Sequence, residues 1–217
     1  MAKEQFLGLP KIGEGHYREV FLINKSMCMK VPKPIVEKRL GPLRIKLPSQ
    51  LYILGLGTSN FNKYEYRIFR RLYPLVPEQL RGCFGKIYGV SGNCLFAETI
   101  RDYDDKLSKT IEETGRIQDK GFWKLFFEVR DFFISNNISF FGGIDSKDIL
   151  VKHLNATEAI PVFIDFKRTG SRQYLFQPWL RLNMFAKMKV ERRFNRIFDR
   201  YTDSPEACAK PELTINL

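Results

Sequence analysis

The chain has 217 residues, which is enough for one substantial core or two small lobes without disulfides or metals to stabilise them. Its residues are 44% hydrophobic and 28% charged, and this balance excludes a disordered or fibrous protein. The formal net charge of +12 favours phosphate-rich partners, such as nucleotides, nucleic acid or anionic lipid, without choosing among them.

The sequence contains no pattern typical of a membrane segment or a metal framework. Met1 to Pro10 holds no apolar run of signal-peptide length, and charged residues interrupt the richest apolar stretch, Phe122 to Phe141. The four cysteines are scattered and form no C-x-x-C pair, which argues against a zinc site or a disulfide framework. We therefore expect a cytoplasmic protein without a transmembrane segment.

The first predicted elements are strands. Apolar and β-branched residues around a turn-rich stretch predict a hairpin over Lys11 to Leu22, and a further strand follows over Ser26 to Val31. Prolines interrupt the basic stretch that comes next, so we expect mostly loop from Pro32 to Asn60.

A helix and two strands follow that loop. The spacing of aromatic residues predicts an amphipathic helix over Asn62 to Tyr73, ended by Pro74. Two strands are predicted over Phe84 to Gly89 and Asn93 to Glu98, joined by a turn at Ser91 and Gly92.

The second half of the chain is mainly helical. Gln118 to Asn136 gives the strongest helical signal, with aromatics on more than one face, as in the buried central helix of a lobe. A strand pair is predicted at Ile149 to Val151 and Val162 to Ile164, and a basic helix at Trp179 to Tyr201. We expect a single domain over residues 1–203, divided into lobes at about residue 100, and a flexible tail over 204–217.

A possible phosphate-binding loop opens the chain in the pattern Gly13-x-Gly15-x-x-Arg18-x-Val20, where missing side chains let backbone N–H groups approach phosphate oxygens. By itself the pattern also fits a tight hairpin without a ligand. Lys30 lies on the next strand, where a kinase places the lysine that pairs the α and β phosphates of ATP. Glu65 is the candidate partner of Lys30, and Glu98 completes the expected nucleotide-binding set.

The segment 141–151 follows the long helix, where the kinase pattern H-R-D-x-x-x-x-N-I-L-V is expected. In that register Asp148 replaces the metal-binding asparagine, and a carboxylate is also a hard oxygen ligand for Mg²⁺. Gly143 replaces the catalytic aspartate, and a glycine cannot act as a general base. Asp145 and Asp148 are the carboxylates that could substitute for it.

The segment 161–167 matches the hydrophobic strand that leads into the kinase D-F-G turn. Asp165 is the expected main Mg²⁺ ligand, and Lys167 replaces the glycine of the turn; an ordinary aspartate capping a strand end is the alternative. Because the pieces occur in one order and in the expected contexts, the sequence predicts an α+β fold. Specifically, it predicts a two-lobed minimal protein-kinase-like fold with a small antiparallel β N-lobe and a mainly helical C-lobe.

The stretch Ile138 to Trp179 resembles the YrbL family, kinase-like proteins named for the PhoP regulatory network of enteric bacteria. The run from Ile149 to Asp165 is similar to the family's segment that joins its N-I-L to its P-V-x-x-D, and Gly15, Arg18, Lys30 and Glu65 correspond to family positions. The resemblance implies binding of ATP and Mg²⁺, and a catalytic loop that lacks its aspartate. Asp148 departs from the family's asparagine.

Two functions remain open from these residues. The first is an ATP-dependent phosphotransferase with a degenerate catalytic loop, in which Lys30, Asp148 and Asp165 carry the chemistry and the acceptor is a protein, an anionic lipid or a saccharide. The second is an inactive pseudokinase, a nucleotide-dependent module that regulates or binds a partner protein.

The late basic helix offers a third hypothesis, peripheral contact with anionic lipid. A solvated helix face is the simpler interpretation, and we do not expect direct nucleic-acid binding. The aromatic residues of this stretch recur at near-helical spacing and are expected to pack the lobe. The basic and the aromatic residues concerned are Arg181, Lys187, Lys189, Arg192, Arg193, Arg196 and Arg200, and Trp179, Phe185, Phe194 and Phe198.

Overall fold

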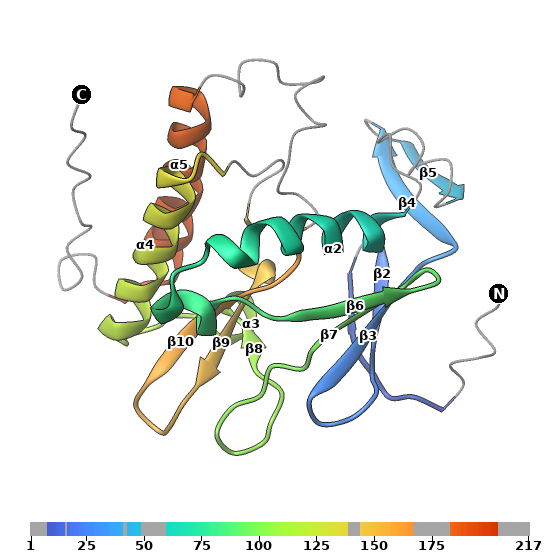
Figure 1. The fold of residues 1–217 in the computed structure, drawn as a ribbon, viewed down its shortest axis with the longest axis horizontal. Coiled ribbons are helices and arrows are strands. Elements are labelled where there is room, and N and C mark those ends of the chain that lie inside the picture. Colours follow the sequence, from blue (N-terminus) through green and yellow to red (C-terminus); the bar gives the residue numbers. More distant parts are fainter. Residues whose placement is uncertain are drawn as a thin grey trace. The chain divides into compact units, whose positions relative to one another are not determined.

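The computed structural model describes residues 8–15, 17–40, 43–48, 60–138, 144–166 and 183–203. They form two compact units (Figure 1). The first unit contains the described residues up to Leu72 together with Gly85–Thr99, and the second contains Tyr73–Phe84 and the described residues from Ile100 onward. The expected tail over 204–217 lies outside the described residues, and the single domain over 1–203 stays a prediction.

An antiparallel sheet of five strands forms the centre of the first unit. The strands are β1 (Lys11–Glu14), β2 (Arg18–Leu22), β3 (Met27–Pro32), β6 (Ile87–Ser91) and β7 (Cys94–Glu98). Their order is β1-β2-β3-β7-β6. The side-chain oxygen of Asn24 accepts hydrogen bonds from the backbone N–H groups of Ser26 and Met27 in the β2–β3 turn. Gly92, at φ 57°, lies between β6 and β7, at the turn that the sequence predicts.

Helix α2 (Phe61–Leu72) packs against this sheet. Asn60 caps it, because its side-chain oxygen accepts hydrogen bonds from the N–H groups of Asn62 and Lys63. The buried positions Phe61, Glu65, Phe69 and Leu72 recur at three- and four-residue spacing, which is the inner face of an amphipathic helix. The predicted helix over 62–73 is confirmed, and the 3₁₀ turn η2 (Tyr73–Leu75) follows it.

The expectation of a loop over Pro32 to Asn60 is wrong for part of that stretch. Strands β4 (Ile35–Leu40) and β5 (Leu43–Pro48) pair antiparallel, in a register that runs from Ile35 opposite Pro48 to Leu40 opposite Leu43. Prolines suggested a loop, but Pro34 and Pro48 lie just before or at a strand end, where a missing N–H costs little. Residues 49–59 lie outside the described residues.

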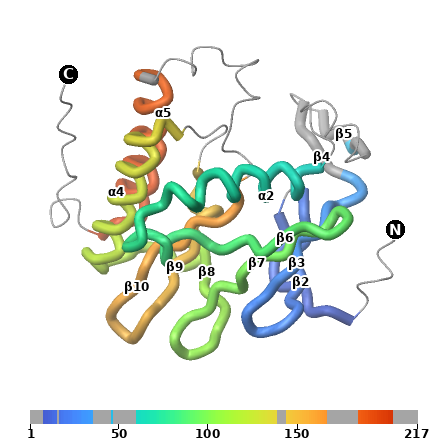
Figure 2. Tube along the Cα trace, in the orientation of Figure 1, coloured from blue at the N-terminus to red at the C-terminus, as the bar shows by residue number. Residues whose placement is uncertain are grey.

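The second unit combines helices with a sheet of three short strands, in the order β10-β9-β8. Figure 2 follows their path along the chain. The elements are η3 (Glu78–Cys83), β8 (Lys109–Thr110), α3 (Ile111–Thr114), α4 (Lys120–Ser135), η4 (Ser146–Asp148), β9 (Ile149–His153), β10 (Ala159–Phe163) and α5 (Asn183–Tyr201). Asp119 joins two of them, because it caps α4 through Gly121 N and accepts a hydrogen bond from Ala159 N at the start of β10.

Aromatic rings fill the core between α4, α5 and β10. Trp123, Phe126, Phe163, Phe194 and Phe198 are all buried, and edge-to-face and stacked contacts connect them. The indole N–H of Trp123 donates to the carbonyl oxygen of Ile117, so its one polar group is satisfied. The prediction of a buried central helix is therefore confirmed. Helices α4 and α5 lie side by side in Figure 1.

The aromatics of the late basic helix divide into two groups. Phe194 and Phe198 pack in the core, as the sequence predicts, but Phe185 is 37% exposed. That part of the prediction is wrong, because Phe185 falls outside the arc of the helix that carries the buried residues Ala186 and Val190. Trp179 and Arg181 lie outside the described residues.

Candidate functional site

Lys30 and Glu65 form a buried ion pair within the first unit. Lys30 lies in the middle of β3, opposite Val20 on β2 and Leu95 on β7. Glu65 lies on the second turn of α2, on the face that packs against the sheet, and it is fully buried. Lys30 Nζ donates to Glu65 Oε1 at 3.4 Å. The structure thus brings together the two residues that the sequence proposed as partners.

Arg18 supplies a second cation to the same carboxylate. It begins strand β2, is only 4% exposed, and its guanidinium donates to Glu65 Oε2 and, at 2.9 Å, to the side-chain oxygen of Asn62. Glu65 therefore binds Lys30 through one oxygen and Arg18 through the other. The sequence assigned Arg18 to the nucleotide, and that role stays a prediction beside this observed contact with Glu65.

Asn62 completes the network, and sequence reasoning missed it. Its side-chain N–H group donates to the carbonyl oxygens of Lys30 at 2.9 Å and Asn93 at 2.6 Å. Because Asn62 is buried and lies three residues before Glu65, it occupies the inner face of α2, where an apolar residue is the norm. No sequence motif marks this position, so the sequence carried no signal for Asn62. Its contacts fix α2 against β3 and the β6–β7 turn.

The glycines of the N-terminal loop are not required by the described fold. Neither Gly13 nor Gly15 has a left-handed backbone, and a Cβ at either would meet its nearest neighbour, on Val20 or Arg18, at 3.7 Å, an ordinary contact. The N–H of Gly15 donates to the carbonyl of Arg18 at 2.8 Å and closes the loop. The packing contacts would accept a Cβ at either position, so a requirement for glycine would have to come from a bound ligand. His16 lies outside the described residues.

Ion pairs hold the edge of this loop. Glu14 binds Lys11 on its own strand and Lys33 beyond β3. Hydrogen bonds from these two lysines lower the pKa of Glu14 from its usual 4.5 to about 2.

Glu98, the other proposed nucleotide-binding residue, ends strand β7. Its carboxylate accepts a hydrogen bond from the backbone N–H of Lys86 at 3.1 Å, and its own N–H donates to the carbonyl of Lys86 at 2.8 Å. These contacts fix the start of β6 to the end of β7. The nucleotide role of Glu98 stays a prediction.

Asp148 and Asp165 lie at the same end of the β9–β10 strand pair in the second unit. Phe163 pairs with Ile149, and the N–H of Ile164 donates to the carbonyl of Asp148 at 2.8 Å. The hairpin therefore brings one residue at the start of β9 beside another just after β10. Antiparallel pairing explains why residues 17 positions apart in the sequence meet here.

Defined local structure surrounds both aspartates. Asp148 forms a capping box with Asp145, in which Asp148 Oδ2 accepts a hydrogen bond from Asp145 N at 3.2 Å. Tyr201 of α5 donates to the Ser146 hydroxyl of the same turn at 3.3 Å. Asp165 has a φ of 67°, a left-handed conformation that non-glycine residues rarely adopt and that often occurs at functional sites.

The donor set of the second unit fits Mg²⁺. In the described part of the chain no group of three or more His, Cys, Asp or Glu side chains converges as a metal cage. Mg²⁺ usually takes one or two carboxylates and completes its shell with phosphates and water. Asp148 and Asp165 match that requirement. The segment with Gly143, at 139–143, and Lys167 lie outside the described residues, so the position of the missing base is not described.

Comparisons with known proteins identify the fold. No protein-family model matches the sequence, and no curated protein does. Among solved structures, the chain is similar to the Rio2 kinase of Chaetomium thermophilum, in its ADP/Mg²⁺-phosphoaspartate complex, with a TM-score of 0.55 at 14% identity. This chain has a protein-kinase-like fold. The match covers 89% of this chain and 56% of that kinase, so this chain spans little more than half the length of its neighbour.

The predicted fold class is thereby confirmed, with an antiparallel β unit followed by a mainly helical one. Membership of the YrbL family stays a hypothesis. Within the described residues, no helix combines the length and apolar character needed to cross a membrane.

Proposed function

We propose that this kinase-like protein binds ATP with Mg²⁺ and acts as a phosphotransferase whose catalytic loop is degenerate. The buried Lys30–Glu65 pair between β3 and α2 is the observation that carries the proposal. Burying a lysine and a glutamate requires desolvating both charges, and this cost makes the Lys30 ammonium a candidate for a functional group.

The first unit supplies the groups for the phosphates. Lys30 pairs with the α and β phosphates through its ammonium, and Glu65 orients that ammonium. Arg18 holds Glu65 from its other oxygen, so Glu65 keeps a cationic partner when Lys30 turns toward a phosphate. Backbone N–H groups of the loop from Gly13 to Val20 approach the phosphate oxygens.

The second unit supplies the carboxylates for the metal. Asp165 is the main Mg²⁺ ligand, and Asp148 is the second. Bound there, Mg²⁺ would neutralise charge on the transferring phosphoryl group. The similar fold of the Rio2 kinase, whose complex contains ADP and Mg²⁺, supports the use of a nucleotide with Mg²⁺, and the choice of ligand residues rests on the sequence motifs.

The reaction would proceed without the usual base, because Gly143 stands at that position of the sequence. Phosphoryl transfer depends mainly on positioning and electrostatic stabilisation, so loss of a base contributing about 10²–10⁴-fold slows the reaction without abolishing it. Asp145, exposed beside Asp148, is the nearest carboxylate in sequence that could accept a proton from an acceptor hydroxyl. The acceptor class is a protein, an anionic lipid or a saccharide.

Gly143 also supports a second candidate function. An inactive pseudokinase would use the same residues to bind nucleotide and would transmit its occupancy to a partner protein. The two functions share their binding site and differ only in turnover.

A combined binding and turnover experiment separates these functions. ATP binding is titrated calorimetrically with Mg²⁺ on the parent, Lys30→Ala and Asp165→Ala, with Lys63→Ala on the exposed face of α2 as the control. We expect binding in the parent and the control that both site variants weaken, and slow release of the γ-phosphate that Asp145→Asn reduces further. Binding without any turnover leaves the pseudokinase, and no binding in the parent contradicts both functions.

A further inference from the structure

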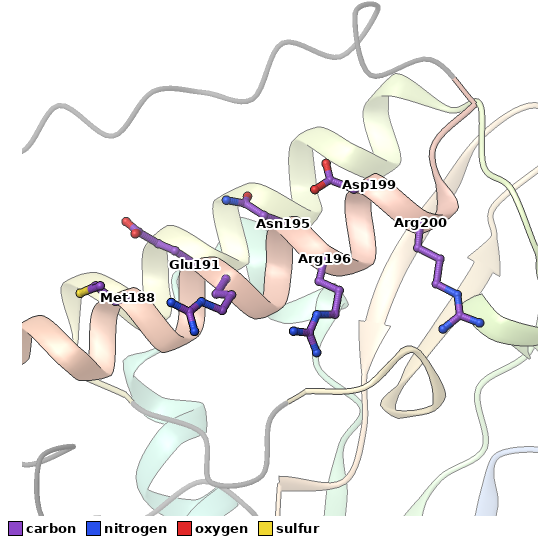
Figure 3. A pocket seen from close by; sticks show the side chains of 7 residues that line it. Met188, Glu191, Asn195, Arg196, Asp199 and Arg200 are labelled. Atoms are coloured by element: carbon purple, nitrogen blue, oxygen red, sulfur yellow. The ribbon is translucent and has the colours of Figure 1, made fainter.

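Helix α5 carries two chemically different flanks on either side of its outer face. Six of its residues are Lys or Arg and two are acidic. At about 3.6 residues per turn, its basic residues from Lys189 onward fall within roughly a third of the helix circumference. This basic flank comprises Lys189, Arg192, Arg193, Arg196 and Arg200. Figure 3 shows Arg196 and Arg200 projecting to one side, and Glu191, Asn195 and Asp199 to the other.

The arginines of the basic flank are not neutralised by the described protein. Arg192, Arg193 and Arg196 form no ion pair with any described residue, although Glu191 and Asp199 belong to the same helix. Arg200 lies over the ring of Tyr201, 5.4 Å from its centroid. Arg192, Arg196 and Arg200 repeat at four-residue spacing, where like charges destabilise a helix unless a counter-charge binds.

Positive charge is crowded within this flank. Burial, and then the charge of Arg193, lower the pKa of Lys189. An external anion would relieve the repulsion, because it can approach several guanidinium groups at once.

Exposed apolar side chains lie at the start of the helix, before its first arginine. Met184, Phe185 and Met188 are 62%, 37% and 46% exposed, although they are large and apolar. They lie on the first two turns of α5, and Met188 begins an open groove of about 690 Å³ that extends along the outer face to Arg200. Exposed methionine and phenylalanine on the turns that precede a row of arginines combine the apolar and cationic groups by which a helix binds a membrane interface.

These observations favour a membrane over nucleic acid as the partner. Phosphates of either partner would pair with the arginines, but a nucleic-acid backbone has no apolar surface that would bury Met184 and Met188. Acyl chains just below the headgroups would bury both side chains. We propose that the basic flank, together with Met184, Phe185 and Met188, docks this protein on an anionic phospholipid surface, with α5 parallel to the membrane plane.

Cosedimentation with vesicles tests this surface in the full chain. One set of vesicles is phosphatidylcholine alone, and the other contains equal parts of phosphatidylcholine and phosphatidylglycerol. We expect the parent to bind only the anionic set, and R192E/R196E to weaken binding at least about 10-fold. Binding should also fall as salt rises, because the Debye length shortens from about 8 Å at physiological ionic strength to about 3 Å at 1 M.

A matched control lies on helix α2. Lys63 and Arg67 are exposed there at the same four-residue spacing, and neither forms an ion pair with a described residue. K63E/R67E changes the net charge by the same amount as R192E/R196E, and it should retain binding. Equal losses in the two double variants would overturn the proposal, because they would show that net charge alone drives binding.

The apolar residues separate a membrane from other polyanions. M184S/M188S should lower vesicle binding several-fold and leave binding to a single-stranded oligonucleotide, used as a soluble polyanion, unchanged. Failure of the parent to bind anionic vesicles overturns the proposal. Binding of the oligonucleotide that needs Arg192 and Arg196, without vesicle binding, also overturns it and identifies nucleic acid as the partner. Unchanged thermal unfolding of the variants excludes misfolding as the cause of a loss.

Discussion

The two units position their charged residues by different means. In the first, oppositely charged side chains hold one another, since Arg18 and Lys30 share the carboxylate of Glu65. In the second, the backbone places Asp148 and Asp165, through the β9–β10 pairing and a left-handed residue. The charges of the first unit are thus coupled to folding stability, whereas those of the second can be altered at less cost to the fold.

The largest expected effect follows from removing the shared carboxylate. Glu65→Ala leaves two cations buried without their partner, and we expect it to lower the free energy of unfolding by about 3–5 kcal/mol. Urea denaturation followed by circular dichroism measures the change. Lys63→Ala, exposed on the same helix, should change it by less than about 0.5 kcal/mol. A similar small effect for both would show that the pair does not hold the first unit together.

Replacing Arg18 and replacing Lys30 should have different effects on folding stability and on ATP affinity. Arg18 contacts both Glu65 and Asn62, whereas Lys30 contacts the carboxylate at 3.4 Å. Arg18→Met should therefore cost more stability, about 2–3 kcal/mol against about 1 kcal/mol for Lys30→Met. Lys30→Met should cost more ATP affinity. The reverse order in both measurements would assign Arg18 to the nucleotide and Lys30 to the structure.

The second unit offers the converse test at Asp165. Because its φ is 67°, Asp165→Gly removes a strained residue and should leave unfolding unchanged or raise its free energy by up to about 1 kcal/mol. Asp165→Ala keeps the strain and should be less stable than Asp165→Gly. Both variants should lose the response to ATP and Mg²⁺. A lower free energy of unfolding in Asp165→Gly would mean that the Asp165 carboxylate also stabilises the fold.

The smallest effect concerns the N-terminal loop at acid pH. The folded pKa of Glu14, about 2, lies below its usual 4.5, so its ion pairs stabilise the fold above pH 4.5, and that contribution disappears as the pH falls toward 2. Glu14→Gln should therefore flatten the acid limb of the stability curve slightly, with little change at neutral pH. Because Glu14 is exposed, raised salt should shrink the difference. If Glu14→Gln leaves the acid limb of the stability curve unchanged at low salt, the ion pairs of Glu14 do not stabilise the fold.

Sequence patterns predicted the elements better than the contacts between them. The β2–β3 strands, α2 and α4 follow from local periodicity and from turn residues such as Gly92. Strands β4 and β5 were missed because prolines at their ends suggested a loop.

The contact between Arg18 and Glu65 could not be read from the sequence. The two residues lie 47 positions apart, and their meeting depends on the register of β2 against β3 and on the phase of α2. The sequence did bring Lys30, Glu65, Asp148 and Asp165 into consideration, since each occurs at a motif position. It gave no sign that Asn62 would join them. Asn62 occupies no motif position, and its contact with the Lys30 carbonyl depends on how α2 packs against β3.

Thermal unfolding with and without ATP and Mg²⁺ tests the central claim most directly. A ligand that binds only the folded state must raise its stability, by about 2.7 kcal/mol when its concentration is 100-fold above the dissociation constant. We predict a rise in the melting temperature of the parent that is lost in both Lys30→Ala and Asp165→Ala and kept in Lys63→Ala. No rise in the parent at millimolar ATP would contradict nucleotide binding and leave a kinase-shaped protein with another task.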